Sequence, residues 1–113
     1  MKRFEDKTLT LEKASAAFAA LGSEQRLAVL QTLVRAGEEG LSMGELGKRA
    51  GVTGSTLTHH LKFLTAAGLV EQAKHGRSII CAAVAYDEIR ALSQFLLANC
   101  CADAAPAKDH DHG

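Results

Sequence analysis

The sequence predicts a mostly helical α+β fold, a winged helix-turn-helix with about five helices and a two-stranded wing. Apolar residues recur at helical spacing in successive segments, four of which end at a glycine. A short cationic hairpin pattern follows the fourth segment. The chain has 113 residues, 47% of them hydrophobic and 4% aromatic, so we expect a single core of aliphatic side chains.

Two helices are predicted at the start of the chain. The first ends at Gly22 and carries its apolar residues at helical spacing: Leu11, Ala14, Ala17, Phe18 and Leu21. Ser23 is a suitable N-cap for the second helix, and Gly37 ends it. The apolar stripe of this second helix consists of Leu27, Leu30, Leu33 and Val34.

A short third helix follows the loop at residues 38–40. Ser42 and Glu45 have the spacing of a capping box, in which each side chain bonds to the backbone amide of the other residue. This pattern predicts a helix that begins after Ser42, runs to about Ala50 and ends at Gly51.

The next helix, from Thr53 to Gly68, is apolar on one stripe only. Leu57, Leu61 and Leu64 lie on that stripe. The remaining faces carry short hydrogen-bonding or cationic side chains, of the kind that contact base edges and phosphates: Ser55, Thr56, Thr58, His59 and Lys62. Two helices joined by a tight turn containing glycine, with a polar second helix, indicate a helix-turn-helix.

A hairpin and a last helix complete the predicted fold. Residues 69–72 and 78–82 are predicted strands, and the tip between them, residues 73–77, carries Lys74 and Arg77. The last helix is expected from about Asp87 to the end of the apolar stretch at Cys100 and Cys101. Its apolar face is too wide for one small core to cover, with Ile89, Leu92, Phe95, Leu96 and Leu97.

The formal net charge of zero conceals a basic middle region. Between residues 46 and 80 five cationic side chains accompany one acid, which leaves a net charge of +4. The excess suits a polyanionic partner but also an ordinary solvated surface. The sequence has no apolar run of the roughly 20 residues that span a bilayer and no signal peptide, so we expect a cytoplasmic protein without a membrane partner. In a reducing compartment its three cysteines would be free thiols.

Three segments resemble the ArsR/SmtB family of metal- and metalloid-sensing repressors: ALGSEQRLAVLQTL (residues 20–33), STLTHHLKFLTAAGLVE (55–71) and HGRSIICAAV (75–84). The resemblance covers about residues 11–101. It implies a non-enzymatic repressor that forms a homodimer through its first and last helices and releases double-stranded operator DNA when an inducer binds. We expect one domain over residues 1–101 and, because residues 102–113 are few and polar, a disordered tail.

The family's motif also implies roles for single residues. It places Ser55, Thr56, Thr58 and His59 at the major groove, and Lys62, Lys74 and Arg77 at phosphates. His60 lies at the edge of the leucine stripe, which favours a packed or bridging role over a base contact. Gly54 departs from the polar side chain often found there in the family.

The sensing site departs from the familiar ones of the family. The third helix lacks the Cys-Val-Cys motif of the arsenite site, and the last helix lacks the paired His and carboxylate ligands of zinc-responsive relatives. The remaining candidates are Cys81 and the adjacent pair Cys100 and Cys101. Some arsenical-responsive relatives share such a pair. Soft thiolates favour trivalent arsenic or antimony as inducer: arsenite or antimonite with three thiolates, methylarsenite with two. Zinc is disfavoured, although His110 and His112 in the tail would complete a four-ligand set.

Helical geometry leaves the number of ligands open. Consecutive side chains on a helix point about 100° apart, so Cys100 and Cys101 face one ion only if the helix end frays. Cys100 also aligns with Leu92 and Leu96, which allows a packing role instead. As a ligand set, the three thiols would tie the wing strand of Cys81 to the last helix.

Two alternatives keep the thiols but change their use. One is a redox or persulfide switch in which Cys81 bonds to Cys100 or Cys101. The other is a thiol enzyme or metallochaperone, which the sequence disfavours because it has no Cys-x-x-Cys motif, no positioned acid–base pair and no glycine-rich phosphate loop.

Overall fold

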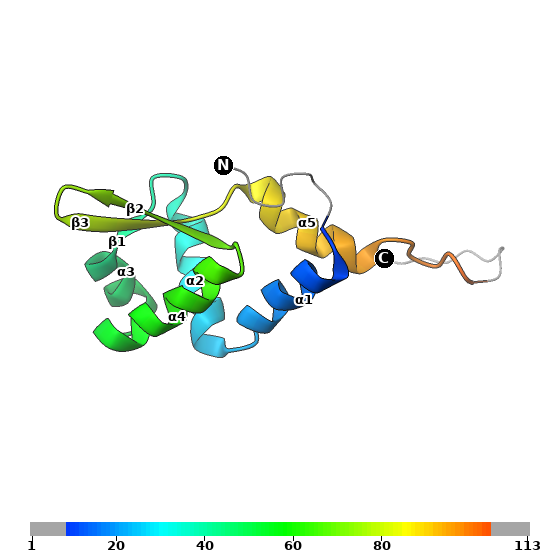
Figure 1. Cartoon of the computed structure of the whole chain (residues 1–113), viewed down its shortest axis with the longest axis horizontal. Coiled ribbons are helices and arrows are strands. Elements are labelled where there is room, and N and C mark those ends of the chain that lie inside the picture. The colour runs from blue at the N-terminus through cyan, green and yellow to red at the C-terminus, as the bar shows by residue number, and fades with distance from the viewer. Residues whose placement is uncertain (1–8, 105–113) are drawn as a thin grey trace.

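The computed structural model describes residues 9–104, and it confirms the predicted winged helix-turn-helix (Figure 1). In chain order the elements are α1 (Leu11–Ala20), α2 (Glu24–Ala36), β1 (Leu41–Ser42), α3 (Met43–Ala50), α4 (Gly54–Ala66), β2 (Val70–His75), β3 (Ser78–Ala83) and α5 (Tyr86–Leu97). Helices α3 and α4 and the β2–β3 hairpin lie at one end of the molecule, on the left of Figure 1. Helices α1 and α5 lie towards the other end.

The predicted helix caps are present. The Ser23 hydroxyl accepts a hydrogen bond from the backbone amide of Arg26 at 3.2 Å, and the Ser42 hydroxyl accepts one from Glu45 at 3.2 Å. The reciprocal half of the predicted capping box is wrong. The Glu45 carboxylate accepts instead from Arg49 Nε at 2.8 Å, one helical turn later, and this bond lowers the pKa of Glu45.

The sheet is larger than the predicted two-stranded wing. β2 and β3 pair out to His75 and Ser78, so the hairpin turn is Gly76 and Arg77 alone and the predicted five-residue tip is wrong. The unpredicted strand β1 pairs antiparallel with β3, with Leu41 opposite Cys81, and the strand order is β1-β3-β2. A two-residue strand is too short to show the alternation of polar and apolar residues on which sequence prediction depends.

A core of aliphatic side chains joins all the helices to the sheet, as the composition predicts. Helices α2, α3 and α4 contribute Leu33, Leu46, Leu61 and Leu64 to it, each with an exposure of 2% or less. The sheet and its approach contribute Leu69, Val70 and Cys81, and Leu92 anchors α5. The core therefore fixes α4 against α2 on one side and against β2 on the other.

Helix α5 ends at Leu97, three residues before the cysteine pair. Asn99 and Cys101 have positive φ values of 63° and 64°, and the amides of Cys100 and Ala102 donate to the carbonyls of Leu97 and Asn99 in tight turns. The prediction that the helix reaches Cys100 and Cys101 is wrong, because left-handed residues interrupt the helical backbone.

Most of the predicted disordered tail, residues 102–113, lies outside the described residues. This part begins at residue 105 and includes His110 and His112. Within residues 9–104 the helices are all too short or too polar to cross a membrane.

Gly40 provides a test of the β1–β3 contact. Its φ is +72°, and a Cβ there would overlap the carbonyl oxygen of Cys81. We expect Gly40→Ala to lower the free energy of unfolding by about 2–4 kcal/mol, from left-handed strain together with overpacking. Gly51→Ala is the matched control, since Gly51 has φ +74° but open space around it, and we expect a loss of about 1 kcal/mol. Equal losses in urea denaturation would show that the strand contact is not tight.

Candidate nucleic-acid interface and cysteine pair

Helix α4 has two opposite faces. Leu57, Leu61 and Leu64 are buried, which turns the stripe of Ser55, His59 and Lys62 to solvent. Both sets repeat at i, i+4 and i+7, so they follow the same helical period on opposite sides. The packing of α4 thus decides which side chains are free to contact a ligand.

Thr56 and Thr58 flank this stripe and are also exposed. The Thr58 hydroxyl donates to the carbonyl of Gly54 at 3.3 Å, so its proton is used within the helix and its oxygen lone pairs remain available. Lys74 and Arg77 are exposed on the hairpin, and Gly76 has the positive φ, 62°, that the two-residue turn requires. All seven residues predicted to contact DNA are therefore at the surface.

His60 is buried, with 7% of its surface exposed. Its Nδ1 accepts from Arg26 Nε at 3.3 Å, and its Nε2 lies 3.0 Å from Gln25 Oε1. Both partners belong to α2, so the structure confirms a bridging role for His60. Sequence reasoning did not identify the partners, which lie about 35 positions away.

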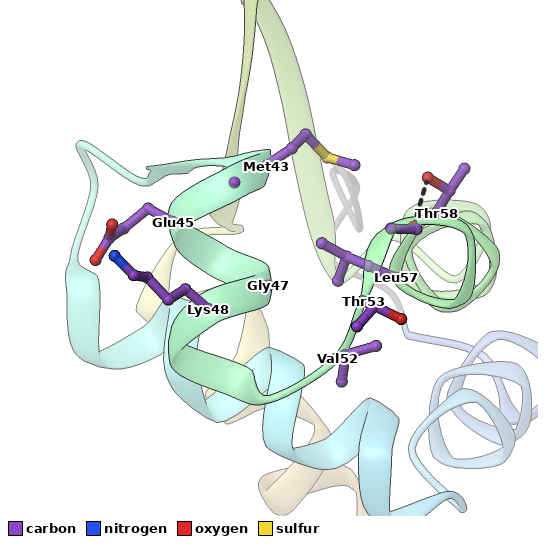
Figure 2. Close-up of a pocket in the computed structure, with 10 residues that line it drawn as sticks. Met43, Glu45, Gly47, Lys48, Val52, Thr53, Leu57 and Thr58 are labelled. Atoms are coloured by element: carbon purple, nitrogen blue, oxygen red, sulfur yellow. Dashed lines mark hydrogen bonds between the residues drawn. The ribbon is translucent and has the colours of Figure 1, made fainter.

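A groove of about 650 Å³ lies between α3 and α4 (Figure 2). Met43 and Leu57 point into the space between the two helices, whereas the charged ends of Glu45 and Lys48 lie on the far side of α3. Apart from Glu45 and Lys48, the groove is lined by apolar, glycine and threonine residues.

Cys81 lies in the core, with none of its surface exposed. Its sulfur accepts from Gln72 Nε2 at 3.5 Å and lies 3.6 Å from Met43 Sδ. Burial raises the pKa of the Cys81 thiol, and the bond from Gln72 offsets only part of that effect. This thiol is held in its neutral form and is shielded from solvent.

Cys100 and Cys101 have the opposite environment. Both are exposed, and their sulfur atoms lie 3.4 Å apart. The hydrogen bond between the two thiols, more than burial, raises the pKa of Cys101. Two accessible sulfurs at this spacing can bond to one thiophilic atom. Because α5 has ended, the expected divergence of about 100° does not apply, and the predicted position of Cys100 on the buried stripe is wrong.

The structure does not bring Cys81 to this pair within one chain. Cys81 lies in β3, before α5, and the pair follows α5, a helix of 12 residues that spans about 18 Å. In residues 9–104 no group of three or more His, Cys, Asp or Glu side chains is arranged to hold a metal ion. The expected three-thiol site and the Cys81 disulfide are therefore not assembled in the single chain.

The sequence has relatives among regulators of transcription. The family described as a helix-turn-helix domain matches residues 21–73, which include α2, α3 and α4. An uncharacterized HTH-type transcriptional regulator of Bacillus subtilis, YceK, is 41% identical over 61 residues. This alignment covers 54% of the present chain and 60% of the Bacillus protein.

Solved structures extend the likeness to the whole fold. An ArsR-like transcriptional regulator from Rhodococcus sp. RHA1 is 34% identical, with a TM-score of 0.66 over 75% of this chain and 76% of that protein. A homodimeric winged helix-turn-helix DNA-binding domain from Mycobacterium bovis, described as a possible ArsR-family regulator, covers 97% of both chains with a TM-score of 0.64. At 17% identity the second likeness concerns the fold alone.

The two thiol environments predict different reactivities. We expect N-ethylmaleimide to modify Cys100 and Cys101 rapidly. Cys81 should react at least about a hundredfold more slowly, because it reacts only after local opening. Mass spectrometry of quenched samples counts the labels, and urea-unfolded protein, in which all three thiols should react alike, is the control. Equal labelling of Cys81 in the folded protein would contradict its burial.

Proposed function

Because this chain belongs to the ArsR family of transcriptional regulators, we propose that it is an inducer-responsive repressor. It binds operator DNA as a homodimer, and a trivalent arsenical bound to Cys100 and Cys101 releases it. The observation that carries the choice of inducer is the 3.4 Å spacing of two exposed sulfurs immediately after α5.

In this proposal the exposed stripe of α4 enters the major groove. Ser55, Thr56, Thr58 and His59 offer donors and acceptors to base edges, and Lys62 contacts phosphate. Lys74 and Arg77 on the β2–β3 hairpin bind the backbone beside the groove. A twofold dimer places two such units on half-sites about one DNA turn apart.

The homodimer is supported by apolar side chains that one chain leaves uncovered. Leu11 and Phe18 on α1 and Tyr86, Leu96 and Leu97 on α5 are all exposed. A second copy placed on these helices would remove this apolar surface from water. The Mycobacterium bovis domain with the same fold is described as homodimeric.

The chemistry of the pair favours a trivalent centre over zinc. A structural zinc site requires four ligands, and in residues 9–104 no group of three or more His, Cys, Asp or Glu side chains is arranged to hold a metal ion. A trivalent arsenic that carries one methyl group requires only two thiolates. Methylarsenite has two hydroxyl groups, and each leaves as water with one thiol proton as an arsenic–sulfur bond forms. Two cysteines therefore replace both hydroxyl groups of methylarsenite, and Cys81 is not required.

The position of the pair explains how binding would reach the DNA. Residues 98–101 turn tightly behind Leu96 and Leu97, which lie on the proposed dimer surface. A ring closed through Cys100, Cys101 and arsenic constrains this turn. The inducer then favours a dimer geometry in which the two α4 helices no longer match their half-sites, by its differential affinity for the two states.

The phosphate contacts are tested through the salt dependence of binding. For a duplex selected by the protein from a random pool, we expect Lys62→Ala to reduce the slope of log affinity against log salt by about 2, from one lost phosphate contact in each subunit. Arg35→Ala is the control, since Arg35 is exposed on α2, outside the interface. Fluorescence anisotropy measures the slope, and an unchanged slope would remove Lys62 from the interface.

The inducer site is tested by release from the same duplex under anaerobic conditions. We expect methylarsenite to release the wild type and Cys81→Ser at similar concentrations. Cys100→Ser or Cys101→Ser should require at least about tenfold more, because one arsenic–sulfur bond is lost.

Two results would overturn the arsenical proposal. The first is normal release of the Cys100→Ser/Cys101→Ser double variant by methylarsenite. The second is equal release of the wild type by peroxide or persulfide, which would identify the thiols as an oxidation switch.

A further inference from the structure

Arg26 makes three contacts that join three helices. Its Nε donates to His60 Nδ1 of α4 at 3.3 Å, and its Nη1 donates to the carbonyl of Ala20, the last residue of α1, at 3.1 Å. Its guanidinium also lies 4.3 Å from the centre of the Phe63 ring on α4. Arg26 belongs to α2, so this one side chain connects α1, α2 and α4.

These contacts fix the protonation state that His60 needs. Arg26 can only donate, so His60 Nδ1 must be the acceptor and must carry no proton. The ring proton of neutral His60 is therefore on Nε2, where it is donated to Gln25 Oε1 at 3.0 Å. Protonation of Nδ1 would remove the acceptor and place a second cation against Arg26.

The same contacts lead to the exposed face of α4. Phe63 contacts both Arg26 and His59, and the His59 ring meets it edge-on at 5.1 Å between centroids. His59 is one of the residues proposed to face DNA. The orientation of α4 and of His59 thus depends on a side chain that is anchored on α1 and α2.

We propose that Arg26 and His60 act as a positioning clamp that holds α4 in its DNA-binding orientation relative to α1, and that protonation of His60 opens the clamp and weakens operator binding. This inference rests on the proposed DNA-binding function. Neither residue contacts DNA; each acts through the placement of α4.

The surroundings of His60 set the direction of the pH effect. The titratable and charged groups that face it are Arg26 from α2 and His59 from its own helix, and Gln25 is uncharged. Burial first, then the charges of Arg26 and His59, lower the pKa of His60 from its ordinary value of 6.5. Unfolded protein therefore takes up the proton first, so stability falls as pH decreases below 6.5 and levels off below the folded pKa.

The test isolates His60 among the five histidines of the chain. In the reference protein, His59, His75, His110 and His112 are replaced by Gln, which removes other histidine charges from the DNA interface. Its affinity for the selected duplex is compared at pH 7.5 and pH 5.5 with that of the same protein carrying His60→Asn. The Asn side chain keeps an acceptor for Arg26 and does not titrate.

We expect the reference protein to lose affinity on acidification, and to lose it more steeply than His60→Asn. The proton that opens the clamp is taken up as the pH approaches and passes below the folded pKa of His60, and each further pH unit costs about tenfold for a group that must be neutral. His60→Asn should bind comparably at pH 7.5 and change less than threefold. Equal pH slopes in the two proteins would overturn the clamp.

Nitrogen NMR of the free full-length protein gives a second readout that does not require DNA or the Asn variant. We expect His60 to carry its proton on Nε2 and Arg26→Gln to raise its pKa. A proton on Nδ1, or an unchanged pKa in Arg26→Gln, would overturn the clamp even if His60→Asn fails to fold. If the random pool gives no preferred duplex at pH 7.5, the repressor function fails, while this readout still decides whether the clamp exists.

Discussion

Burial of the leucine stripe of α4 is the contact on which the rest of the structure depends. Leu57, Leu61 and Leu64 are almost completely removed from water, and each such side chain contributes about 1.5–3 kcal/mol. A rotation of α4 about its axis would expose this stripe, so the rotation is fixed. The polar residues that face solvent are then a direct consequence of core packing, and the surface available for recognition is set before any ligand is present.

Packing against the core also explains why the three cysteines differ in exposure. Cys81 is buried because helices α2 and α3 pack against β3 and strands β1 and β2 flank it. Met43 and Gln72 lie against its sulfur. Cys100 and Cys101 lie beyond Leu92, the last buried residue of α5, and beyond Phe95, which is partly buried against the core. The backbone there is free to form tight turns. Accessibility, rather than chemical type, separates a thiol that supports the core from two that can bind a ligand.

The sequence predicted the features that depend on local chemistry. Ser23 and Ser42 bond to amides three residues away, and glycines end helices by their own backbone freedom, so these signals are contained within a few positions. Strand β1 depends on pairing with residues about 40 positions later. The Glu45 carboxylate bonds to Arg49 and not to the Ser42 amide that the capping-box spacing predicted, because the two partners compete for the same side chain. At the end of α5 the apolar pattern continued past Leu97, and only Asn99, a residue tolerant of positive φ, signalled the stop.

A physical route connects the cysteine pair to α4 through packed elements. Helix α5 packs on α1, and α1 ends at the carbonyl of Ala20, to which Arg26 donates. Arg26 in turn bonds to His60 on α4, so a displacement of α1 in the dimer acts on α4 through a directional hydrogen bond as well as through apolar packing. Apolar contacts tolerate small sliding, whereas a guanidinium held by two acceptors and a ring face does not. The Arg26 contacts therefore give α1 a directional link to α4 in addition to the apolar packing between these helices.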